Sequence, residues 1–130
     1  MKILIVEDDQ VSSLFLKKTL SEYGDCDITI DGMETLEAYL ISMQEDMPYD
    51  LICLDIMIPK INGVKVLKSI RELERKKRIR KNKCVKVMVI TALAETEFVS
   101  DSLNEGYDVY LEKPIDKKKI QEAMSKLGVL

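Results

Sequence analysis

Four short apolar runs in this sequence each lead into residues that could bind a cation or a phosphate group. These residues comprise several acids, one hydroxyl and one amine: Glu7, Asp8 and Asp9 after residues 3–6, Asp55 after 51–54, Thr91 after 87–90, and Lys113 shortly after 109–111. Carboxylate oxygens suit Mg²⁺, while hydroxyl and ammonium groups donate hydrogen bonds to phosphate oxygens. If the chain brings these residues together, they suit a divalent cation beside a phosphoryl group.

The acidic residues are candidates for a cation site, because clustered carboxylates stay ionised together at neutral pH only beside positive charge. We expect Asp8, Asp55 and Glu7 to bind the cation, and Asp9 chiefly to cap the helix that follows. A carboxylate at Asp55 that faces Mg²⁺ could also act as a nucleophile and take up a phosphoryl group as an acyl phosphate. The structural alternative for Asp55 is another metal ligand or a loop cap.

Thr91 and Lys113 are candidates for contacts to phosphoryl oxygens, through a hydroxyl and a point charge respectively. Taken alone, each would more often be an ordinary strand-end threonine or a solvated lysine. Together with the acids they indicate one shared binding site, because each residue is expected at the same end of a strand.

The elements that would position these residues are strands and helices in alternation. Short, near-continuous apolar runs are typical of strands buried on both faces of a parallel sheet. Strands that alternate with helices imply right-handed crossovers and helices on both faces, which is an α/β fold. In such an open sheet, ligands bind outside the carboxyl ends of the strands. The second strand (26–30) and the fifth (109–111) are the more polar, so we expect them at the edges.

Helices are expected between these strands and after the last one. Their apolar positions recur at helical spacing: Phe15, Leu16, Leu20 and Tyr23 in the first, Met33, Leu36, Leu40 and Met43 in the second, Val66, Leu67, Ile70 and Leu73 in the third, and Ile120, Ala123, Met124 and Leu127 in the last. We expect Gly24 to end the first helix. A fourth helix is expected from about Glu95 to Asn104.

The composition narrows the class of protein. The 130 residues fit one compact domain, so we expect residues 1–130 to be a single domain with no output domain. We expect a cytoplasmic protein without membrane segments, because no run approaches the roughly 18 apolar residues of a membrane helix and no secretory leader precedes the first strand. A net charge of −3 does not suggest direct DNA binding.

The counts of two residue types also limit the chemistry. The chain has no histidine, which excludes histidine-based catalytic triads and histidine metal sites. Any phosphohistidine must therefore come from a partner. The three cysteines lack metal-ligand spacing, and we expect Cys53 and Cys84 to act as small apolar groups within strands.

A basic segment lies between Arg71 and Lys86. It contains seven basic residues: Arg75, Lys76, Lys77, Arg78, Arg80, Lys81 and Lys83. We interpret it as a solvated helix end, whose cations favour the helix C-terminus. The alternative is docking to an acidic partner or to phosphate.

The motifs together resemble the receiver domain of bacterial two-component response regulators. The resemblance rests on residues 3–9, on 54–59 with Gly63, on 90–92 and on Lys113-Pro114, and it covers essentially the whole chain. It implies a five-stranded, doubly wound, flavodoxin-like (βα)5 fold of three layers. It also implies a phosphorelay protein that is not an enzyme in its own right, apart from self-phosphorylation and slow self-dephosphorylation.

The resemblance also assigns roles to individual residues. Asp55 would accept a phosphoryl group from the phosphohistidine of a sensor histidine kinase or phosphotransfer protein. Mg²⁺, for which Mn²⁺ can substitute, would be held by Asp8, Asp55 and the main-chain carbonyl of Met57, with Glu7 reaching it through water. Thr91 and Lys113 would contact the phosphoryl oxygens, and the bond before Pro114 would be cis.

The same resemblance suggests how a signal would leave the site. Thr91 would move toward the phosphoryl group, and Tyr110 would turn inward and alter the face of the fourth helix, fifth strand and fifth helix, which would control an unknown protein target. The structural alternative is that Tyr110 simply packs on the last helix. The chain departs from the family pattern only slightly, with Ile58 before Pro59 and apolar Met57 and Leu93 beside the water path, from which we expect slow self-hydrolysis.

Three rival functions remain from the sequence. An aspartate-nucleophile phosphohydrolase would place a second aspartate two residues after Asp55, where this chain has Met57. A flavin carrier would need a phosphate loop after the first strand, where the acids would repel phosphate. A degenerate receiver that binds partners without phosphorylation would not need the intact residue set.

Overall fold

The computed structural model describes residues 1–92 and 106–128. Along the chain the elements are β1 (Lys2–Val6), α1 (Gln10–Leu20), β2 (Asp25–Thr29), α2 (Gly32–Gln44), β3 (Leu51–Asp55), α3 (Gly63–Lys76), the 3-10 helix η1 (Lys81–Lys83), β4 (Lys86–Thr91), β5 (Val109–Glu112) and α5 (Lys117–Lys126). The expected helix from Glu95 to Asn104, and Leu93, lie outside the described residues. Among the described residues, no helix is long and apolar enough to cross a membrane.

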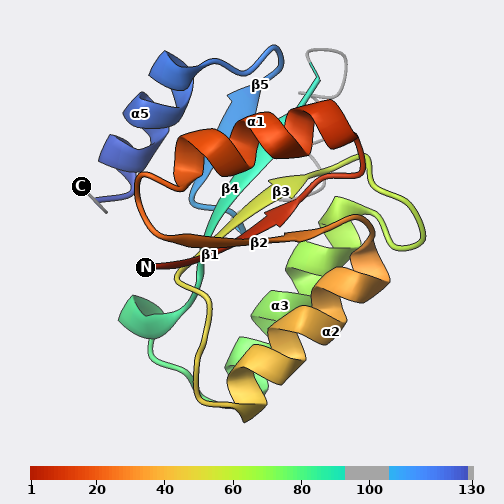
Figure 1. The fold of residues 1–130 in the computed structure, drawn as a ribbon. Coiled ribbons are helices and arrows are strands. Elements are labelled where there is room, and N and C mark those ends of the chain that lie inside the picture. The colour runs from red at the N-terminus through yellow and green to blue at the C-terminus, as the bar shows by residue number, and fades with distance from the viewer. Residues whose placement is uncertain (93–105, 129–130) are drawn as a thin grey trace.

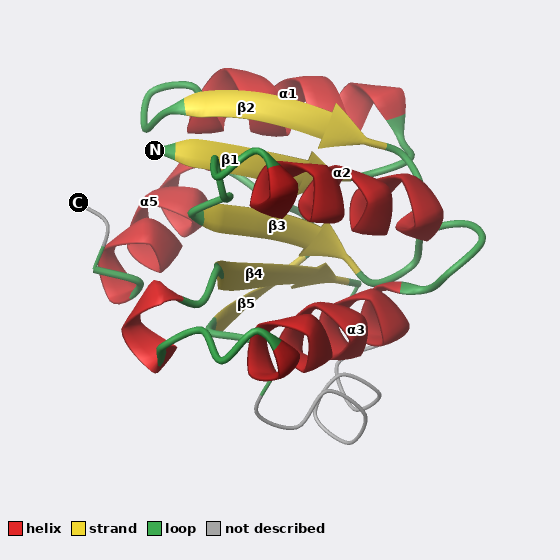
Figure 2. Ribbon diagram, turned by 90° about the horizontal axis from the view of Figure 1, so that it is seen from below, coloured by secondary structure: helices red, strands yellow, loops and turns green. Residues whose placement is uncertain are grey.

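The strands form one five-stranded sheet in the order β2-β1-β3-β4-β5, and every pair is parallel. In Figure 1, α1 and α5 lie on one face of the sheet and α2 and α3 on the other. The predicted doubly wound, three-layer α/β fold is therefore confirmed, including the edge positions of β2 and β5. Figure 2 shows the strands running in one direction, so that their carboxyl ends meet at one edge.

Two apolar cores hold the layers together, because alternate residues of each strand face opposite sides of the sheet. Leu4, Ile52 and Leu54 belong to the core beneath α2 and α3. Ile3 and Cys53 belong to the core beneath α1 and α5. With both faces covered, β3 is buried along its whole length, which explains its continuous apolar sequence.

The buried face of α2 agrees only in part with the one predicted, because Leu36 and Met43 pack against the core as expected but the other two residues do not. Met33 is 58% exposed and Leu40 is 37% exposed, whereas the helix buries Gly32, Thr35, Tyr39 and Ser42. Thr35 can be buried because its hydroxyl hydrogen-bonds the hydroxyl of Thr29 at 2.7 Å and donates to the Asp31 carbonyl at 2.8 Å. The polar partners that allow Thr35 to be buried lie just before the helix, so the apolar pattern within the helix could not predict that part of its buried face.

Two smaller predictions were also wrong. The first helix ends at Leu20, not at Gly24. Gly24 instead meets the backbone of Met1, where an added Cβ would lie 2.1 Å from the carbonyl oxygen. Cys84 precedes β4 instead of lying within it, and it follows η1, a helix that the sequence reading did not include.

Candidate functional site

The candidate residues gather at the carboxyl edge of the sheet because the strands end level with one another. Val6, the last residue of β1, pairs with Leu54, directly before Asp55. Thr91, the last residue of β4, pairs with Glu112, directly before Lys113. The backbone N–H of Lys113 donates to the Thr91 carbonyl at 2.8 Å, which fixes the lysine beside the end of β4.

Three carboxylates converge at this edge. Glu7, Asp8 and Asp55 each present an oxygen within 4.8 Å of the others. Glu7 and Asp55 are buried, at 2% and 3% exposure, while Asp8 is exposed. Two buried carboxylates and one exposed carboxylate thus face a shared space that is open to solvent on the Asp8 side.

Lys113 supplies the positive charge beside these acids. Its Nζ donates to Asp55 Oδ2 at 2.8 Å and lies 3.6 Å from Glu7 Oε1. Burial lowers the pKa of Lys113, but the hydrogen bond and charge of Asp55 and the charge of Glu7 outweigh burial and raise it. The ammonium group is therefore charged at neutral pH and holds the Asp55 carboxylate in place.

One lysine does not satisfy all the acids. Neither side-chain oxygen of Glu7 has a hydrogen-bond partner among the described residues, although both are buried. Burial and the neighbouring Asp55 carboxylate raise the pKa of Glu7 to about 8. A buried, unsatisfied carboxylate is costly, and a cation with oxygen ligands would relieve that cost. The donor set therefore fits a hard divalent ion such as Mg²⁺.

The loop that follows Asp55 folds back against the end of β3 and is fixed there by hydrogen bonds. The N–H of Met57 donates to Asp55 Oδ1 at 3.0 Å, and Gly63 N–H donates to the Ile56 carbonyl at 2.9 Å. An added Cβ at Gly63 would lie 2.7 Å from both the Asp55 carbonyl oxygen and the Ile56 Cα, so the loop can close only over glycine. Both carboxylate oxygens of Asp55 are thus oriented, one by Met57 and one by Lys113.

The remaining candidates have distinct positions. Thr91 is fully buried and its hydroxyl donates to the Ala92 carbonyl at 3.1 Å. Asp9 caps α1 by accepting from the Ser12 N–H at 2.8 Å, as expected. The Lys113–Pro114 peptide bond is cis. Tyr110 is 40% exposed and packs edge-on against Tyr107, with ring centroids 5.8 Å apart.

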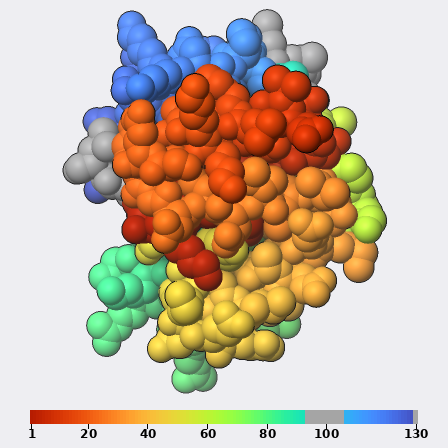
Figure 3. All heavy atoms as spheres, in the orientation of Figure 1, coloured from red at the N-terminus to blue at the C-terminus, as the bar shows by residue number. Residues whose placement is uncertain are grey.

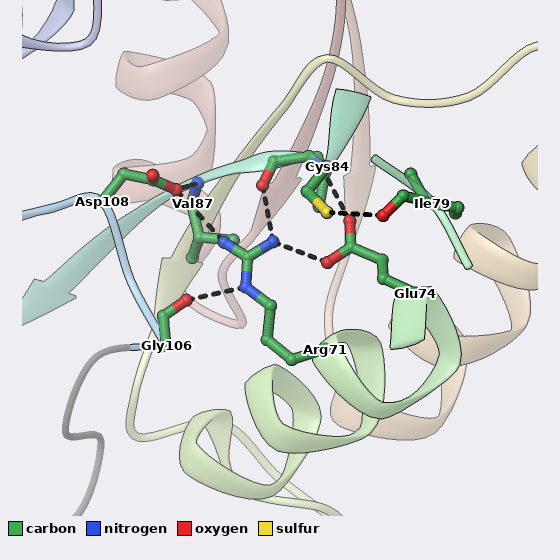
Figure 4. Close-up of polar contacts among 8 residues, drawn as sticks. Arg71, Glu74, Ile79, Cys84, Val87, Gly106 and Asp108 are labelled. Atoms are coloured by element: carbon green, nitrogen blue, oxygen red, sulfur yellow. Dashed lines mark hydrogen bonds and ion pairs between the residues drawn. The ribbon is translucent and has the colours of Figure 1, made fainter. Parts of the chain in front are cut away.

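The structure also contains a polar cluster that the sequence reading missed, at the opposite end of α3 (Figure 4). Arg71 Nη1 donates to Glu74 Oε1 at 2.7 Å and to the Val85 carbonyl at 2.8 Å. Its other nitrogens donate to the Gly106 carbonyl at 2.8 Å and to Asp108 Oδ2 at 3.1 Å. The i,i+3 spacing of Arg71 and Glu74 could have indicated the pair, but not the two distant segments that it joins.

Comparison with known proteins assigns this arrangement to a family. The model of the response regulator receiver domain matches residues 3–125. The response regulator ArlR of Staphylococcus saprophyticus is 36% identical over 130 residues, which cover 99% of this chain and 51% of that protein. The chemotaxis protein CheY of Treponema pallidum is 30% identical, over 95% of this chain and 80% of that protein.

Solved structures show the same fold. The bacteriophytochrome response regulator RtBRR superposes with a TM-score of 0.78 at 25% identity, over 99% of this chain and 78% of that one. A response regulator receiver domain protein from Clostridium thermocellum gives 0.76 at 20% identity, over 95% and 90% of the two chains. This chain spans about half the length of ArlR and of the transcriptional regulatory protein CusR of Escherichia coli.

Proposed function

Because this chain belongs to the response regulator receiver domain family of two-component signalling, we propose that it is a phosphorylation-dependent switch in which Asp55 accepts the phosphoryl group. The phosphoryl donor is the phosphohistidine of a sensor histidine kinase or phosphotransfer protein, since the chain has no histidine of its own. The observation that carries this proposal is the 2.8 Å contact between Lys113 Nζ and Asp55 Oδ2, beside a Glu7 carboxylate that has no hydrogen-bond partner within residues 1–92 and 106–128.

Asp8, Asp55 and the main-chain carbonyl of Met57 would hold Mg²⁺, or Mn²⁺ in its place, and Glu7 would reach the ion through water. When bound, the ion neutralises charge on the acids and on the incoming phosphoryl group. The support for this site is the convergence of three carboxylates within 4.8 Å, of which Glu7 has no hydrogen-bond partner among the described residues.

The chain's own residues perform the transfer. An oxygen of the Asp55 carboxylate attacks phosphorus, the P–N bond to the donor imidazole breaks, and an acyl phosphate forms. Lys113 then exchanges its hydrogen bond from Asp55 to a phosphoryl oxygen, and the hydroxyl of Thr91 turns from the Ala92 carbonyl toward another. The buried position of Asp55 excludes most water, and apolar Met57 in place of a polar group keeps hydrolysis slow.

The phosphoryl group adds about −1.5 to −2 charge at one point, and this biases an existing equilibrium between two conformations. Movement of Thr91 would be followed by inward rotation of Tyr110, which is now 40% exposed and packs edge-on against Tyr107. The altered face then controls a downstream protein. Solution NMR with beryllofluoride and Mg²⁺ tests this step, and it fails if no resonance shifts near Tyr110.

The protein acts as a cytoplasmic signalling module without direct DNA binding, and it is not an enzyme toward outside phosphoesters. The rival phosphohydrolase would need an acid–base group where Met57 lies, and Met57 is a 60% exposed apolar side chain. A receiver that never becomes phosphorylated would not need the Lys113–Asp55 contact.

The decisive experiment is incubation with acetyl phosphate and Mg²⁺, followed by intact mass measurement. We expect wild type to gain the mass of one phosphoryl group, and Asp55→Asn to gain none. EDTA should abolish the gain. An unmodified wild-type protein would indicate the degenerate receiver, and steady release of phosphate from p-nitrophenyl phosphate would indicate the hydrolase.

A further inference from the structure

The last residues of α3 and the segment that follows it toward β4 carry an unusual concentration of positive charge. Between Arg75 and Lys83 there are seven basic residues and no acidic one, and all seven side chains are exposed. The rest of the chain is strongly acidic, since the net charge of the whole is −3. We call this segment, residues 75–83, the basic loop.

The basic loop lacks compensating acids. Of its seven cations, only Arg75 pairs with an acidic side chain within residues 1–92 and 106–128, namely Glu72 at 2.7 Å. A helix C-terminus gains from one or two cations in its last turn. The last turn of α3 holds Arg75 and Lys76, and the five cations that follow it repel one another, so solvation of a helix end does not account for the whole segment.

One of these residues occupies a backbone conformation that disfavours it. Arg78 has φ of 54°, in the left-handed region where glycine is preferred. Its N–H donates to the Arg75 carbonyl and the Ile79 N–H donates to the Glu74 carbonyl, each at 3.0 Å, which is the Schellman ending of a helix. Both bonds come from the backbone and glycine would form them with less strain. Arg78→Gly would therefore remove the side chain while keeping this helix ending.

The two ends of the basic loop are tied together by the polar cluster shown in Figure 4. Glu74 Oε2 accepts from the Val85 N–H at 2.8 Å, and Arg71 donates to the Val85 carbonyl at 2.8 Å. These bonds close the segment at its two ends. A surface that is ordered before binding loses less conformational entropy when a partner binds.

The basic loop lies far from the phosphoacceptor. It precedes Lys86, where β4 starts, whereas Asp55 and Thr91 lie where their strands end. In Figure 1, η1 is at the opposite end of the sheet from the strand tips, and Figure 3 shows the blue-green segment around residue 80 standing out from the body. A partner bound there leaves the Asp55 site open to a phosphoryl donor.

We propose that the basic loop is a docking surface for an acidic segment of a partner protein. Arginine and lysine together suit carboxylates, which they bind by paired hydrogen bonds and by point charges. A hollow of about 1150 Å³ adjoins the loop, and Leu40, Leu73 and Ile79 are among the residues that line it. The acids in the lining, Glu72, Glu74 and Asp108, are each paired with an arginine, so the hollow can take an apolar side chain of a segment whose carboxylates meet the basic loop.

The charge balance favours an acidic protein segment over nucleic acid. An extended polyanion would also meet the acidic remainder of the chain, which would repel it. The basic loop, residues 75–83, has no aromatic residue on which a base could stack. A short acidic segment would meet the basic loop and the adjoining hollow without extending over the acidic remainder of the chain.

The test uses a fluorescein-labelled synthetic peptide of glutamates around a central leucine, and fluorescence anisotropy at low salt. We expect Lys76→Glu/Lys81→Glu/Lys83→Glu to weaken peptide binding by roughly tenfold or more. The matched control is Lys17→Glu/Lys18→Glu/Lys126→Glu, which makes the same charge change at exposed positions elsewhere. The control should retain most of the binding, and the Asp55→Asn protein should bind as wild type does.

A second pair of variants separates charge from backbone strain. Arg78→Gly should raise the melting temperature of the protein while weakening its binding to the peptide. Lys60→Gly removes another basic residue from a left-handed position, φ 68°, near the opposite end of the molecule, and it should leave peptide binding unchanged. Equal loss in both lysine triples, or tighter binding of a duplex DNA of matched charge, would overturn the proposal.

Discussion

The buried ion pair between Arg71 and Glu74 lends itself to a quantitative prediction. Replacing Arg71 by methionine keeps the aliphatic stem but removes four hydrogen bonds, to Gly106, Glu74, Val85 and Asp108. The Glu74 side chain, 3% exposed, then keeps the Val85 N–H as a donor but loses its ion-pair partner among the described residues. Breaking a buried pair by removing one partner costs about 3 to 5 kcal/mol.

We take the lower figure, about 3 kcal/mol, because the Arg71 side chain is 18% exposed and water can reach part of the gap. For a domain of this size, such a loss lowers the melting temperature by about 10 °C. Urea denaturation of wild type and Arg71→Met, followed by circular dichroism, measures the difference directly.

The chain contains its own control for this experiment. Glu72 and Arg75 form a second pair with the same 2.7 Å distance and i,i+3 spacing, but their side chains are 52% and 69% exposed. Solvent screens such a pair, so Arg75→Met should leave stability unchanged within error. In Arg71→Met/Glu74→Gln the uncompensated charge is gone, and the double variant should be more stable than Arg71→Met. A similar small loss for Arg71→Met and Arg75→Met would refute the reasoning.

Two further predictions concern the phosphoacceptor site. Gly63→Ala should destabilise the protein by about 2 kcal/mol, because the new Cβ would lie 2.7 Å from the Asp55 carbonyl oxygen. The same clash should slow labelling of Asp55 by acetyl phosphate, and an unchanged labelling rate would show that the loop adapts. The pKa of Glu7 is raised to about 8 in the folded protein, above its value in the unfolded chain. The metal-free protein is therefore most stable below the unfolded-state pKa, where Glu7 is protonated in both states, and it loses this stability as the pH rises through 8. In EDTA, Glu7→Gln should therefore raise the melting temperature more at pH 9 than at pH 6, and equal effects at both pH values would contradict the burial argument.

The sequence determined the strands, the layer arrangement and the chemistry of the site. Acids, a hydroxyl and an amine follow consecutive apolar runs, and parallel strands bring their carboxyl ends to one edge. That rule was sufficient to place Glu7, Asp8, Asp55, Thr91 and Lys113 near one another, because it depends on local patterns and on a topology with few alternatives.

Only the tertiary structure decided which polar side chains are buried and which backbones meet. Thr35 can be buried because the Thr29 hydroxyl hydrogen-bonds its own hydroxyl. Position 24 requires glycine because the backbone of Met1 leaves no space for a side chain there. Arg71 joins the segments at Val85 and Gly106, which are distant in the sequence. Such contacts depend on neighbours that folding alone supplies, and no spacing within a single helix or turn encodes them.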